Sequence, residues 1–494
     1  MSVPLSELLT ATAVTDHNAD PQLRVESLCY DSRRCRPGAL FFALRGAKED
    51  GTRFVAQAAQ QGAVAIVSDA ALSACALPLI QVPNARLAMA EMAAAFYGRP
   101  ADALKVMGVT GTNGKTTTAF LVKHLLDADQ RRCGLVGTVK YCVGDREFDA
   151  PRTTPESVDL QDLLAQMVAA GSRAVAMEVS SHALVQHRTD AIGFDTAVFT
   201  NLTQDHLDFH RTMDAYFEAK ARLFDGLTRQ KKKARAIINL DDRFGRFLIE
   251  RFEKQLQVIT YGQGVHANFR ATNVRFDATG SSFQLTAKGR EYLVRSPLIG
   301  SFNIYNTLAA LAAANAMGME LRAAVAAMAK APQVPGRLER VQVKRSFQVF
   351  VDYAHTDDAL RNVLRTLREL KPRRLVTVFG CGGDRDRAKR PLMAAAAEEF
   401  SDWCILTSDN PRSEDPLRIL EDIRKGLRGK RFEEIPDRAE AIQRAVQLAG
   451  PGDIVLLAGK GHETYQEFAD GKRIPFDDVA VARRAIEAKR VEVG

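Results

Sequence analysis

Apolar runs alternate with helical segments along the whole chain, and three such series can be distinguished. In the first, the runs LFFAL (40–44), AVAIVSD (63–69) and PLIQV (78–82) are separated by alanine-rich segments. Short apolar runs bounded by polar turns predict buried strands. The first series therefore predicts a small α/β domain that ends near residue 100.

The second series begins at LKVMGVTG (104–111) and continues through AVAMEVS (174–180), TAVFTNL (196–202) and ARAIINLDD (234–242). Strands this apolar are buried on both faces, which predicts a parallel sheet covered by helices. Between 265 and 298 apolar and polar residues alternate, with turn signals at ATGS and AKGR. That alternation predicts an antiparallel insertion at the edge of the sheet.

In the third series each of four apolar strands is followed at once by a polar segment. The strands are QVFVDYA (348–354), RLVTVFG (374–380), WCILTS (403–408) and DIVLLAG (453–459). In a parallel sheet such segments emerge at one carboxyl edge, where these sheets bind ligands. The topology therefore gathers seven polar side chains around one crevice: His355, Arg385, Asp409, Asn410, Arg412, Lys460 and Glu463.

At 494 residues the chain is too long for one ordinary core. We expect an α/β protein of three domains. Residues 1–102 form the first, and 103–335 form a central P-loop domain with a parallel sheet and its antiparallel edge insertion. Residues 336–494 form a Rossmann-like domain, and Pro335 with Gly336 suits a hinge before it.

Composition narrows the class of protein. The apolar fraction is 46% and the charged fraction 26%, no apolar run reaches the ~20 residues of a membrane span, and the N-terminus lacks the pattern of a secretion signal. We therefore expect a cytoplasmic protein with no membrane insertion. Seven scattered cysteines without a C-x-x-C pair indicate reduced, buried thiols. The net charge of +8 is spread along the chain, which favours small anionic substrates over nucleic acid.

The segment GVTGTNGKTTTAF leads from a strand into a helix. Gly111 and Gly114 let backbone N–H groups surround phosphate oxygens, Lys115 reaches the terminal phosphates, and Thr116 offers its hydroxyl to Mg²⁺. The spacing departs from G-x-x-x-x-G-K-[ST], because Val109 stands where the first glycine is usual. The remaining T-G-T-N-G-K-T still favours a nucleotide-phosphate loop over a chance glycine-rich turn.

Two further strand ends carry candidate metal ligands. Glu178 lies near the end of a buried strand, and His206 follows another strand within NLTQDHLDFH. Burying a lone carboxylate costs several kcal/mol, so we expect Glu178 to meet a cation. One interpretation makes both residues ligands or indirect partners of Mg²⁺, and the other makes Glu178 part of a structural salt bridge and His206 a core histidine.

Lys220 falls at helical spacing on the apolar stripe formed by Tyr216, Phe217, Leu223 and Phe224. A lysine at such a position normally extends its ammonium to water. Alternatively, burial lowers its pKa until the neutral amine reacts with CO₂, and the resulting carbamate can hold a metal.

The segment TSDNPRSEDP (407–416) can be a polar turn or a pocket for a ligand that carries both charges. Its position at the crevice edge favours the pocket. Near the N-terminus, LCYDSRRC contains Asp31, Ser32 and Arg33, and taken alone it is an ordinary loop.

The chain resembles the Mur ligase family over nearly its whole length, through motifs that occur in the family's order. They are GVTGTNGKTT, RTTPESVDL, MEVSSHAL before QHR, NLTQDHLDFH, YFEAKARLF, GSFNIYNTLAA, VPGRLE, VDYAHTDDAL, GCGGDRDRAKRP, DNPRSEDP and GKGHE. One departure is Asp357, where the family usually has proline. A proline there suits the first position of a helix, so the change casts little doubt on function.

The resemblance implies four groups of site residues. Those around ATP are Gly111, Thr112, Asn113, Gly114, Lys115, Thr116, Thr117, Asn303, Asn306, Arg337, Asp352 and His355. Those around the nucleotide-sugar peptide are Leu28, Asp31, Ser32, Thr153, Thr154, Ser180, Gln186 and Arg188. Those around diaminopimelate are Arg385, Asp409, Asn410, Arg412, Gly459 and Glu463. Those around Mg²⁺ are Thr116, Glu178, His206 and Lys220 as a carbamate derived from CO₂, and Lys115, Lys220, His206 and Glu178 would be catalytic.

The resemblance also implies a reaction. A monomer would use ATP to join meso-diaminopimelate to UDP-MurNAc-L-Ala-D-Glu through an acyl phosphate, with hinge motion during the cycle. In the family, DNPR accompanies diaminopimelate and lysine-adding members differ there. A lysine-adding member and folylpolyglutamate synthase are the alternative enzymes, and a P-loop ATPase switch is the alternative of another class.

Overall fold

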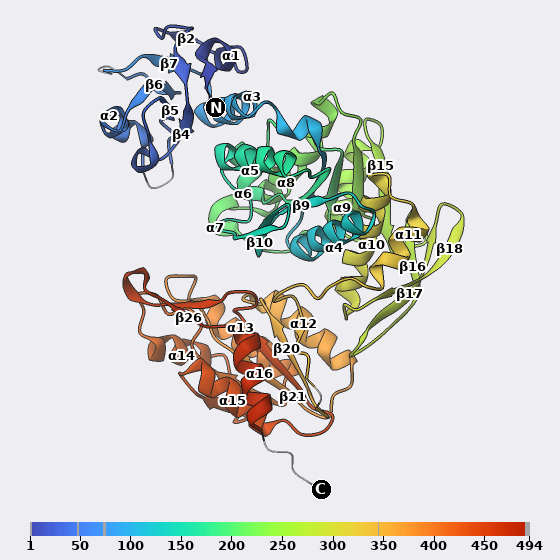
Figure 1. Cartoon of the computed structure of the whole chain (residues 1–494). Helices are drawn as coiled ribbons and strands as arrows, with labels where there is room; N and C mark the ends of the chain where they lie inside the picture. Colours follow the sequence, from blue (N-terminus) through green and yellow to red (C-terminus); the bar gives the residue numbers. More distant parts are fainter. Residues whose placement is uncertain (1, 47–48, 73–75, 344, 490–494) are drawn as a thin grey trace. The chain divides into compact units, whose positions relative to one another are not determined.

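The computed structural model describes residues 2–46, 49–72, 76–343 and 345–489 (Figure 1). The chain divides into two compact units. The first comprises Met1–Ala271, Leu285–Tyr292 and Tyr305–Ala327, and the second comprises Thr272–Gln284, Leu293–Ile304 and Met328–Gly494. The predicted α/β class is confirmed. The predicted domain boundaries stay a prediction.

The N-terminal part of the first unit is a five-stranded sheet in the order β2-β7-β6-β5-β4, in which only β2 is antiparallel. Its core combines strand residues such as Leu40 and Val67 with Met89 and Phe96 of a helix. The three predicted strands are confirmed. The bounds are β1 Val3–Pro4, α1 Leu5–Leu9, β2 Asp16–His17, β3 Arg24–Val25, β4 Ser27–Cys29, β5 Ala39–Phe42, α2 Val55–Gln60, β6 Ala63–Ser68, β7 Leu79–Gln81 and α3 Ala85–Phe96.

The large central sheet has the order β11-β10-β9-β12-β8-β13-β14-β15-β16-β17-β18. Its six middle strands from β9 to β15 are parallel, as the apolar pattern predicts. The strands are β8 Lys105–Thr110, β9 Cys133–Val136, β10 Lys140–Val143, β11 Arg146–Asp149, β12 Ala174–Glu178, β13 Thr196–Phe199, β14 Arg235–Asn239, β15 Gln257–Gly262, β16 Phe269–Asp277, β17 Gly280–Ala287 and β18 Arg290–Ser296.

The edge of this sheet carries the predicted insertion. Two-residue connections join β16 to β17 and β17 to β18, and neighbouring strands joined so tightly run antiparallel. The opposite edge carries an antiparallel hairpin, β10 with β11, that the sequence analysis missed. The helices here are α4 Lys115–Ala128, α5 Ser157–Ala169, α6 Ser181–Val185, α7 Leu207–His210, α8 Met213–Arg229, α9 Arg243–Phe252, α10 Ser301–Ala316 and α11 Leu321–Met328.

The C-terminal sheet of the second unit has the order β19-β20-β24-β21-β22-β23, with helices around it (Figure 1). The four predicted strands are parallel neighbours, so the segments after them share one edge. The bounds are β19 Glu339–Arg340, β20 Gln348–Asp352, α12 Asp357–Glu369, β21 Leu375–Phe379, α13 Lys389–Phe400, β22 Trp403–Leu406, α14 Pro416–Arg424, β23 Phe432–Glu434, α15 Arg438–Leu448, β24 Ile454–Ala458, β25 Tyr465–Glu467, β26 Arg473–Pro475 and α16 Asp478–Ala488.

Local capping explains two sequence features of this sheet. Asp357 opens α12 behind the N-cap Thr356, whose hydroxyl accepts the N–H of Ala359 at 3.2 Å. The side chain of Asp415 caps α14, whose first residue is Pro416. The second proline of TSDNPRSEDP therefore starts a helix.

Two expectations from composition can be compared with the structure. None of the helices among the described residues has the length and apolar character needed to cross a bilayer. Six cysteines lie within the described residues and all six are buried free thiols, as expected, while Cys75 lies outside them.

Candidate functional site

The loop between β8 and α4 requires glycine at two positions. Gly111 and Gly114 have φ angles of 149° and 86°, in the range that disfavours a side chain. A Cβ at Gly111 would lie 1.8 Å from Oγ1 of Thr200, and one at Gly114 would lie 2.3 Å from Oδ1 of Asn306. Polar side chains therefore approach this loop closely, and the predicted ATP residue Asn306 is one of them.

Hydrogen bonds fix the same loop. The N–H groups of Thr112 and Asn113 donate to the carbonyl oxygen and to Oδ1 of Asn201, at 2.8 and 3.0 Å. Lys115 folds back, and its Nζ donates to the carbonyls of Gly111 and Thr112 at 2.9 and 2.7 Å. Hydrogen bonds between ionised partners are stronger than those to neutral carbonyls, so an entering phosphate would draw Lys115 toward itself.

Glu178 ends β12 beside the start of α4 and is only 1% exposed. Its Oε2 accepts the hydroxyls of Thr116 and Thr138 at 3.0 and 3.1 Å, and its Oε1 accepts the N–H of Thr138 at 2.7 Å. The structural salt bridge weighed for Glu178 is wrong, because within the described part of the chain neutral donors, not a cation, hold this carboxylate.

The donors around Glu178 fit Mg²⁺, which takes oxygen ligands and keeps several waters. A carboxylate and the Thr116 hydroxyl, 3.0 Å apart, supply two such oxygens next to the phosphate loop. The residues that the structure describes include no group of three or more His, Cys, Asp or Glu side chains suited to a metal. Further ligands could come from His206, waters, phosphate oxygens or a modified side chain.

Lys220 lies on the buried face of α8 and is 1% exposed. Its Nζ donates to the carbonyl of Gly111 at 2.8 Å and lies 4.5 Å from the ring centroid of Tyr216. Burial first, and then the charge of Lys115, hold the pKa of Lys220 well below that of an ordinary lysine. The interpretation in which this lysine extends to water is wrong. The structure places a buried amine of lowered pKa directly behind the phosphate loop.

His206 lies in the turn after β13 with a left-handed φ of 53°, and its side chain is 46% exposed. Its ring centroid lies 5.0 Å from that of His182 and 6.0 Å from that of Tyr216. The core-histidine interpretation is therefore wrong. The ring is open to a ligand and lies near Tyr216, the residue that Lys220 contacts.

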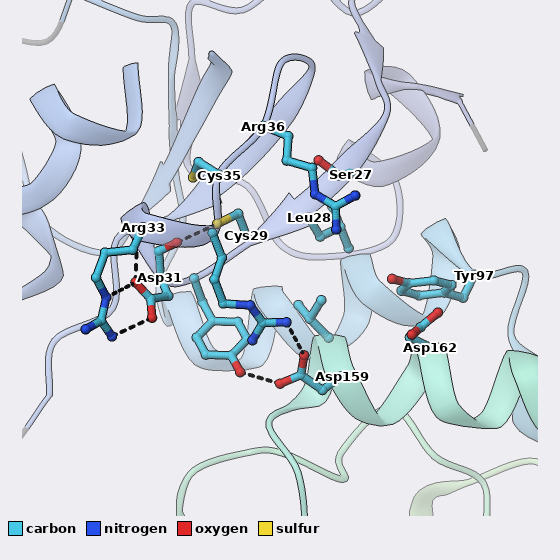
Figure 2. A pocket seen from close by; sticks show the side chains of 13 residues that line it. Ser27, Leu28, Cys29, Asp31, Arg33, Cys35, Arg36, Tyr97, Asp159 and Asp162 are labelled. Carbon is cyan, nitrogen blue, oxygen red and sulfur yellow. Dashed lines mark hydrogen bonds and ion pairs between the residues drawn. The ribbon is translucent and has the colours of Figure 1, made fainter. Parts of the chain in front are cut away.

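A cavity of about 450 Å³ lies between the N-terminal sheet and α5 (Figure 2). Leu28 and Asp31, two of the residues that the resemblance places around the nucleotide-sugar peptide, line it. Ser32 does not line it, because its hydroxyl is buried and donates to Oε1 of Gln57 at 2.7 Å. The α5 residue Asp162, which lies beside Tyr97 in the lining, was not anticipated (Figure 2).

The charges around this cavity are arranged in pairs. Asp31 accepts from Nε and from a terminal nitrogen of Arg33 at 2.9 and 2.7 Å, which holds the pKa of its carboxyl below the usual value. Asp159 accepts from the hydroxyl of Tyr30, and from Arg34 at 3.4 Å. Arginine donors beside an aromatic residue suit a nucleotide with charged phosphates.

Five further residues that the resemblance places around the nucleotide-sugar peptide lie together: Thr153, Thr154, Ser180, Gln186 and Arg188. Thr154 donates to the carbonyl of Glu178 at 2.9 Å and accepts the N–H of Ser180 at 3.1 Å. Arg188 donates to the carbonyl of Thr154 at 2.8 Å and to Oε1 of Gln186 at 2.6 Å. The hydroxyls of Thr153 and Thr138 lie 3.0 Å apart, so this network reaches the neighbours of Glu178.

Two of the predicted ATP residues of the second unit, Arg337 and His355, contact the ring of Tyr353. The guanidinium carbon of Arg337 lies 4.9 Å from the Tyr353 ring centroid, and the ring centroid of His355 lies 4.7 Å from it. Asp352 accepts the N–H groups of Leu338 and Ala354 at 2.6 and 2.8 Å, and burial raises its pKa to about 6. Asn303, also predicted, donates to the carbonyl of Ile299 at 2.8 Å.

The crevice at the edge of the C-terminal sheet brings the two predicted arginines together. A Cβ on Gly382 would lie 3.0 Å from a terminal nitrogen of Arg412 and 3.7 Å from Cγ of Arg385, so both side chains flank this glycine. Arg412 has a left-handed φ of 51°, and its Nε donates to Oε2 of Glu467 at 3.0 Å. One terminal nitrogen donates to the carbonyl of Gly383 at 2.8 Å.

The other crevice residues form a compact network. Nζ of the buried Lys460 donates to Oδ1 of Asn410 and to Oε2 of Glu463 at 3.0 and 3.1 Å. Asn410 also donates to Glu463 at 2.8 Å. A Cβ on Gly459 would lie 2.6 Å from Oδ2 of Asp409, which explains a glycine there. All six residues predicted for the amino acid therefore lie at this edge.

Three contributors escaped the sequence analysis: Thr138, Asn201 and Glu467. Thr138 follows β9, a strand too short to be recognised from its apolar pattern. Asn201 lies inside a predicted strand end, next to residues already singled out. Glu467 is 55 residues from Arg412, and no local pattern links the two.

Comparison with known proteins assigns the family. Three family models match the chain in order: "Mur ligase family, catalytic domain" over residues 24–97, "Mur ligase middle domain" over 109–314, and "Mur ligase, glutamate ligase domain" over 336–461. Together they cover most of the chain.

Relatives and a solved structure agree with these matches. Proteins named UDP-N-acetylmuramoyl-L-alanyl-D-glutamate–2,6-diaminopimelate ligase are 48% identical in Solibacter usitatus, over 94% of each chain, and 46% identical in Geobacillus kaustophilus, over 96% of each. A solved structure of an enzyme of that name is 38% identical, covers 99% of both chains and has a TM-score of 0.72. The chain belongs to the Mur ligase family.

Proposed function

We propose that this protein is an ATP-dependent amide ligase that adds meso-2,6-diaminopimelate to UDP-N-acetylmuramoyl-L-alanyl-D-glutamate. The observation that carries the proposal is the crevice in which Arg385 and Arg412 flank Gly382 beside Asn410 and Glu463. Diaminopimelate differs from lysine by a second carboxylate, and a guanidinium is the side chain best suited to hold one. The names of the most similar relatives support the same substrate.

The phosphate loop has the parts that phosphoryl transfer needs. The substrate carboxylate would attack the γ-phosphate of ATP to form an acyl phosphate, and the amine would then displace phosphate. Two anions repel each other as they approach, so cationic groups must offset their charge. Lys115 would hold the terminal phosphates, and the exposed ring of His206 would face the reacting groups.

Thr116, Glu178 and His206 are the residues proposed to hold Mg²⁺, together with Lys220 as a carbamate. When bound, Mg²⁺ neutralises charge on the transferring phosphoryl group. The burial of Lys220, which lowers the pKa of its amine, supports carbamate formation, because only an unprotonated amine attacks CO₂. A carbamate nitrogen retains one hydrogen, which can still donate to Gly111.

Measuring phosphate release from ATP tests the proposal. The purified chain receives UDP-MurNAc-dipeptide with diaminopimelate, with lysine, or with no amine, each with and without a chelator. Release that requires both diaminopimelate and Mg²⁺ is expected. Equal release with lysine would identify a lysine-adding enzyme instead, and release that does not depend on any amine would identify an ATPase switch.

A further inference from the structure

Glu467 of β25 contacts both recognition residues of the DNPR segment. Its Oε2 accepts from Nε of Arg412 at 3.0 Å, and its carbonyl accepts the N–H of Arg412 at 3.0 Å. Its own N–H donates to Oδ1 of Asn410 at 2.9 Å. The segment that ends at Glu467 therefore holds the backbone and the side chains of this loop at once.

These contacts leave only part of the Arg412 guanidinium for a ligand. Glu467 takes the Nε side, and the carbonyl of Gly383 accepts from one terminal nitrogen at 2.8 Å. Within the described residues the second terminal nitrogen makes no hydrogen bond, and it is not among the buried polar atoms that lack a partner. The terminal edge of the guanidinium is thus the edge that remains open.

We propose that Glu467 is a positioning residue that sets amino-acid specificity, by fixing Arg412 so that its terminal edge receives the distal carboxylate of the substrate. This inference rests on the proposed function. A free arginine side chain samples many rotamers, and fixing it beforehand removes that entropic cost from binding. Without Glu467, the Nε edge would also be open to the same carboxylate, and Arg412 would no longer present one defined edge to it.

Charge pairing in the crevice supports a positioning role. Arg412 and Lys460 each face a carboxylate, Glu467 and Glu463, so the pairs carry no net charge. Diaminopimelate also carries two positive and two negative groups near neutral pH. A ligand of zero net charge needs correctly placed donors and acceptors more than it needs a surplus of one sign.

The test compares Glu467→Ala and Glu467→Gln with Glu433→Ala. Glu433 forms an ion pair with Nε and a terminal nitrogen of Arg444 at 2.8 and 2.9 Å, and it lies on β23, so it serves as a matched control away from DNPR. Phosphate release is measured with diaminopimelate, lysine or ATP varied, and the folded state is compared by thermal unfolding.

Glu467→Ala should raise the KM for diaminopimelate about tenfold, leave the KM for ATP within about twofold, and reduce the preference over lysine. Glu467→Gln should recover most of the affinity, because its amide oxygen still accepts from Nε. An unchanged KM for diaminopimelate, or equal changes in the KM values for ATP and diaminopimelate, would overturn the role of Glu467 and leave the proposed function standing. If the unaltered chain shows no diaminopimelate-dependent release, the proposed function fails, and the inference with it.

Discussion

The phosphate loop region and the amino-acid crevice differ in the partners that hold their ionisable side chains. Lys220, Glu178 and Lys115 are held mainly by neutral hydroxyls and carbonyls. In the crevice, Arg412 and Lys460 are held by carboxylates. The first region thus surrounds its ionisable side chains with neutral groups, which suits highly charged ligands, whereas the second pairs opposite charges and suits a zwitterion.

The largest effect is expected from replacing Lys220 in the phosphate loop region. Lys220→Ala should lower kcat about 10²- to 10³-fold, because the carbamate and its negative charge are lost. Short-chain carboxylates should restore part of the phosphate release. Lys231→Ala, an exposed lysine, is the control. Full activity of Lys220→Ala would end the carbamate hypothesis.

The second unit also contains a buried ionisable side chain, Asp352, whose ionised form is disfavoured by burial. Its pKa in the folded chain is about 6, above the ordinary value of about 3.9. Its stabilising contribution is therefore complete below the unfolded pKa and is lost as pH rises through 6. The free energy of unfolding should fall by up to about 3 kcal/mol from this group between pH 4 and 7.

Urea unfolding followed by fluorescence measures this loss, because the only tryptophan of the chain, Trp403, lies on β22 of the second unit. Asp352→Asn should flatten the pH dependence, whereas Asp386→Asn, at an exposed position, should not. The same slope in Asp352→Asn as in the unaltered chain would refute the assignment.

Removal of the Arg412 guanidinium should affect the amino-acid crevice and leave the phosphate loop region unaffected. Arg412→Ala should raise the KM for diaminopimelate about 50-fold, since a charge-assisted bidentate contact is lost. The KM for ATP should stay nearly constant in steady-state phosphate release. Arg418→Ala, exposed on α14, is the control. An unchanged KM for diaminopimelate would favour the interpretation of TSDNPRSEDP as an ordinary polar turn.

The smallest expected effect concerns Thr138, which supports Glu178. Thr138→Val keeps the backbone N–H at 2.7 Å from Oε1 and removes only the hydroxyl contact at 3.1 Å. We expect the Mg²⁺ concentration for half-maximal activity to rise about fivefold. A magnesium titration measures this shift. No shift would mean that the hydroxyl does not orient Glu178.

The glycine at position 336 has a structural explanation other than the hinge expected from the sequence. A Cβ on Gly336 would lie 2.2 Å from the backbone nitrogen of His462. Close approach of two backbones therefore already requires glycine. The hinge stays a prediction, and identical solution scattering with and without substrates would count against it. The monomeric state and the cytoplasmic location also stay predictions.

Local patterns were sufficient to predict the strands, the order of the motifs and the sheet edge where the polar segments meet. These depend on apolar periodicity and on the rule that parallel strands end at one edge. The sequence by itself thus determined which residues could form the sites, including Gly111, Glu178, Lys220 and Arg412. It left open how each of them is held.

Only the tertiary structure decided which partners those residues meet. The burial of Lys220 behind Gly111, the hydroxyl partners of Glu178 and the pairing of Arg412 with Glu467 join residues 109, 62, 40 and 55 positions apart. No local pattern encodes contacts at such separations, because they arise when distant strands and turns pack together. The same packing fixes burial, and burial determines the pKa of Lys220.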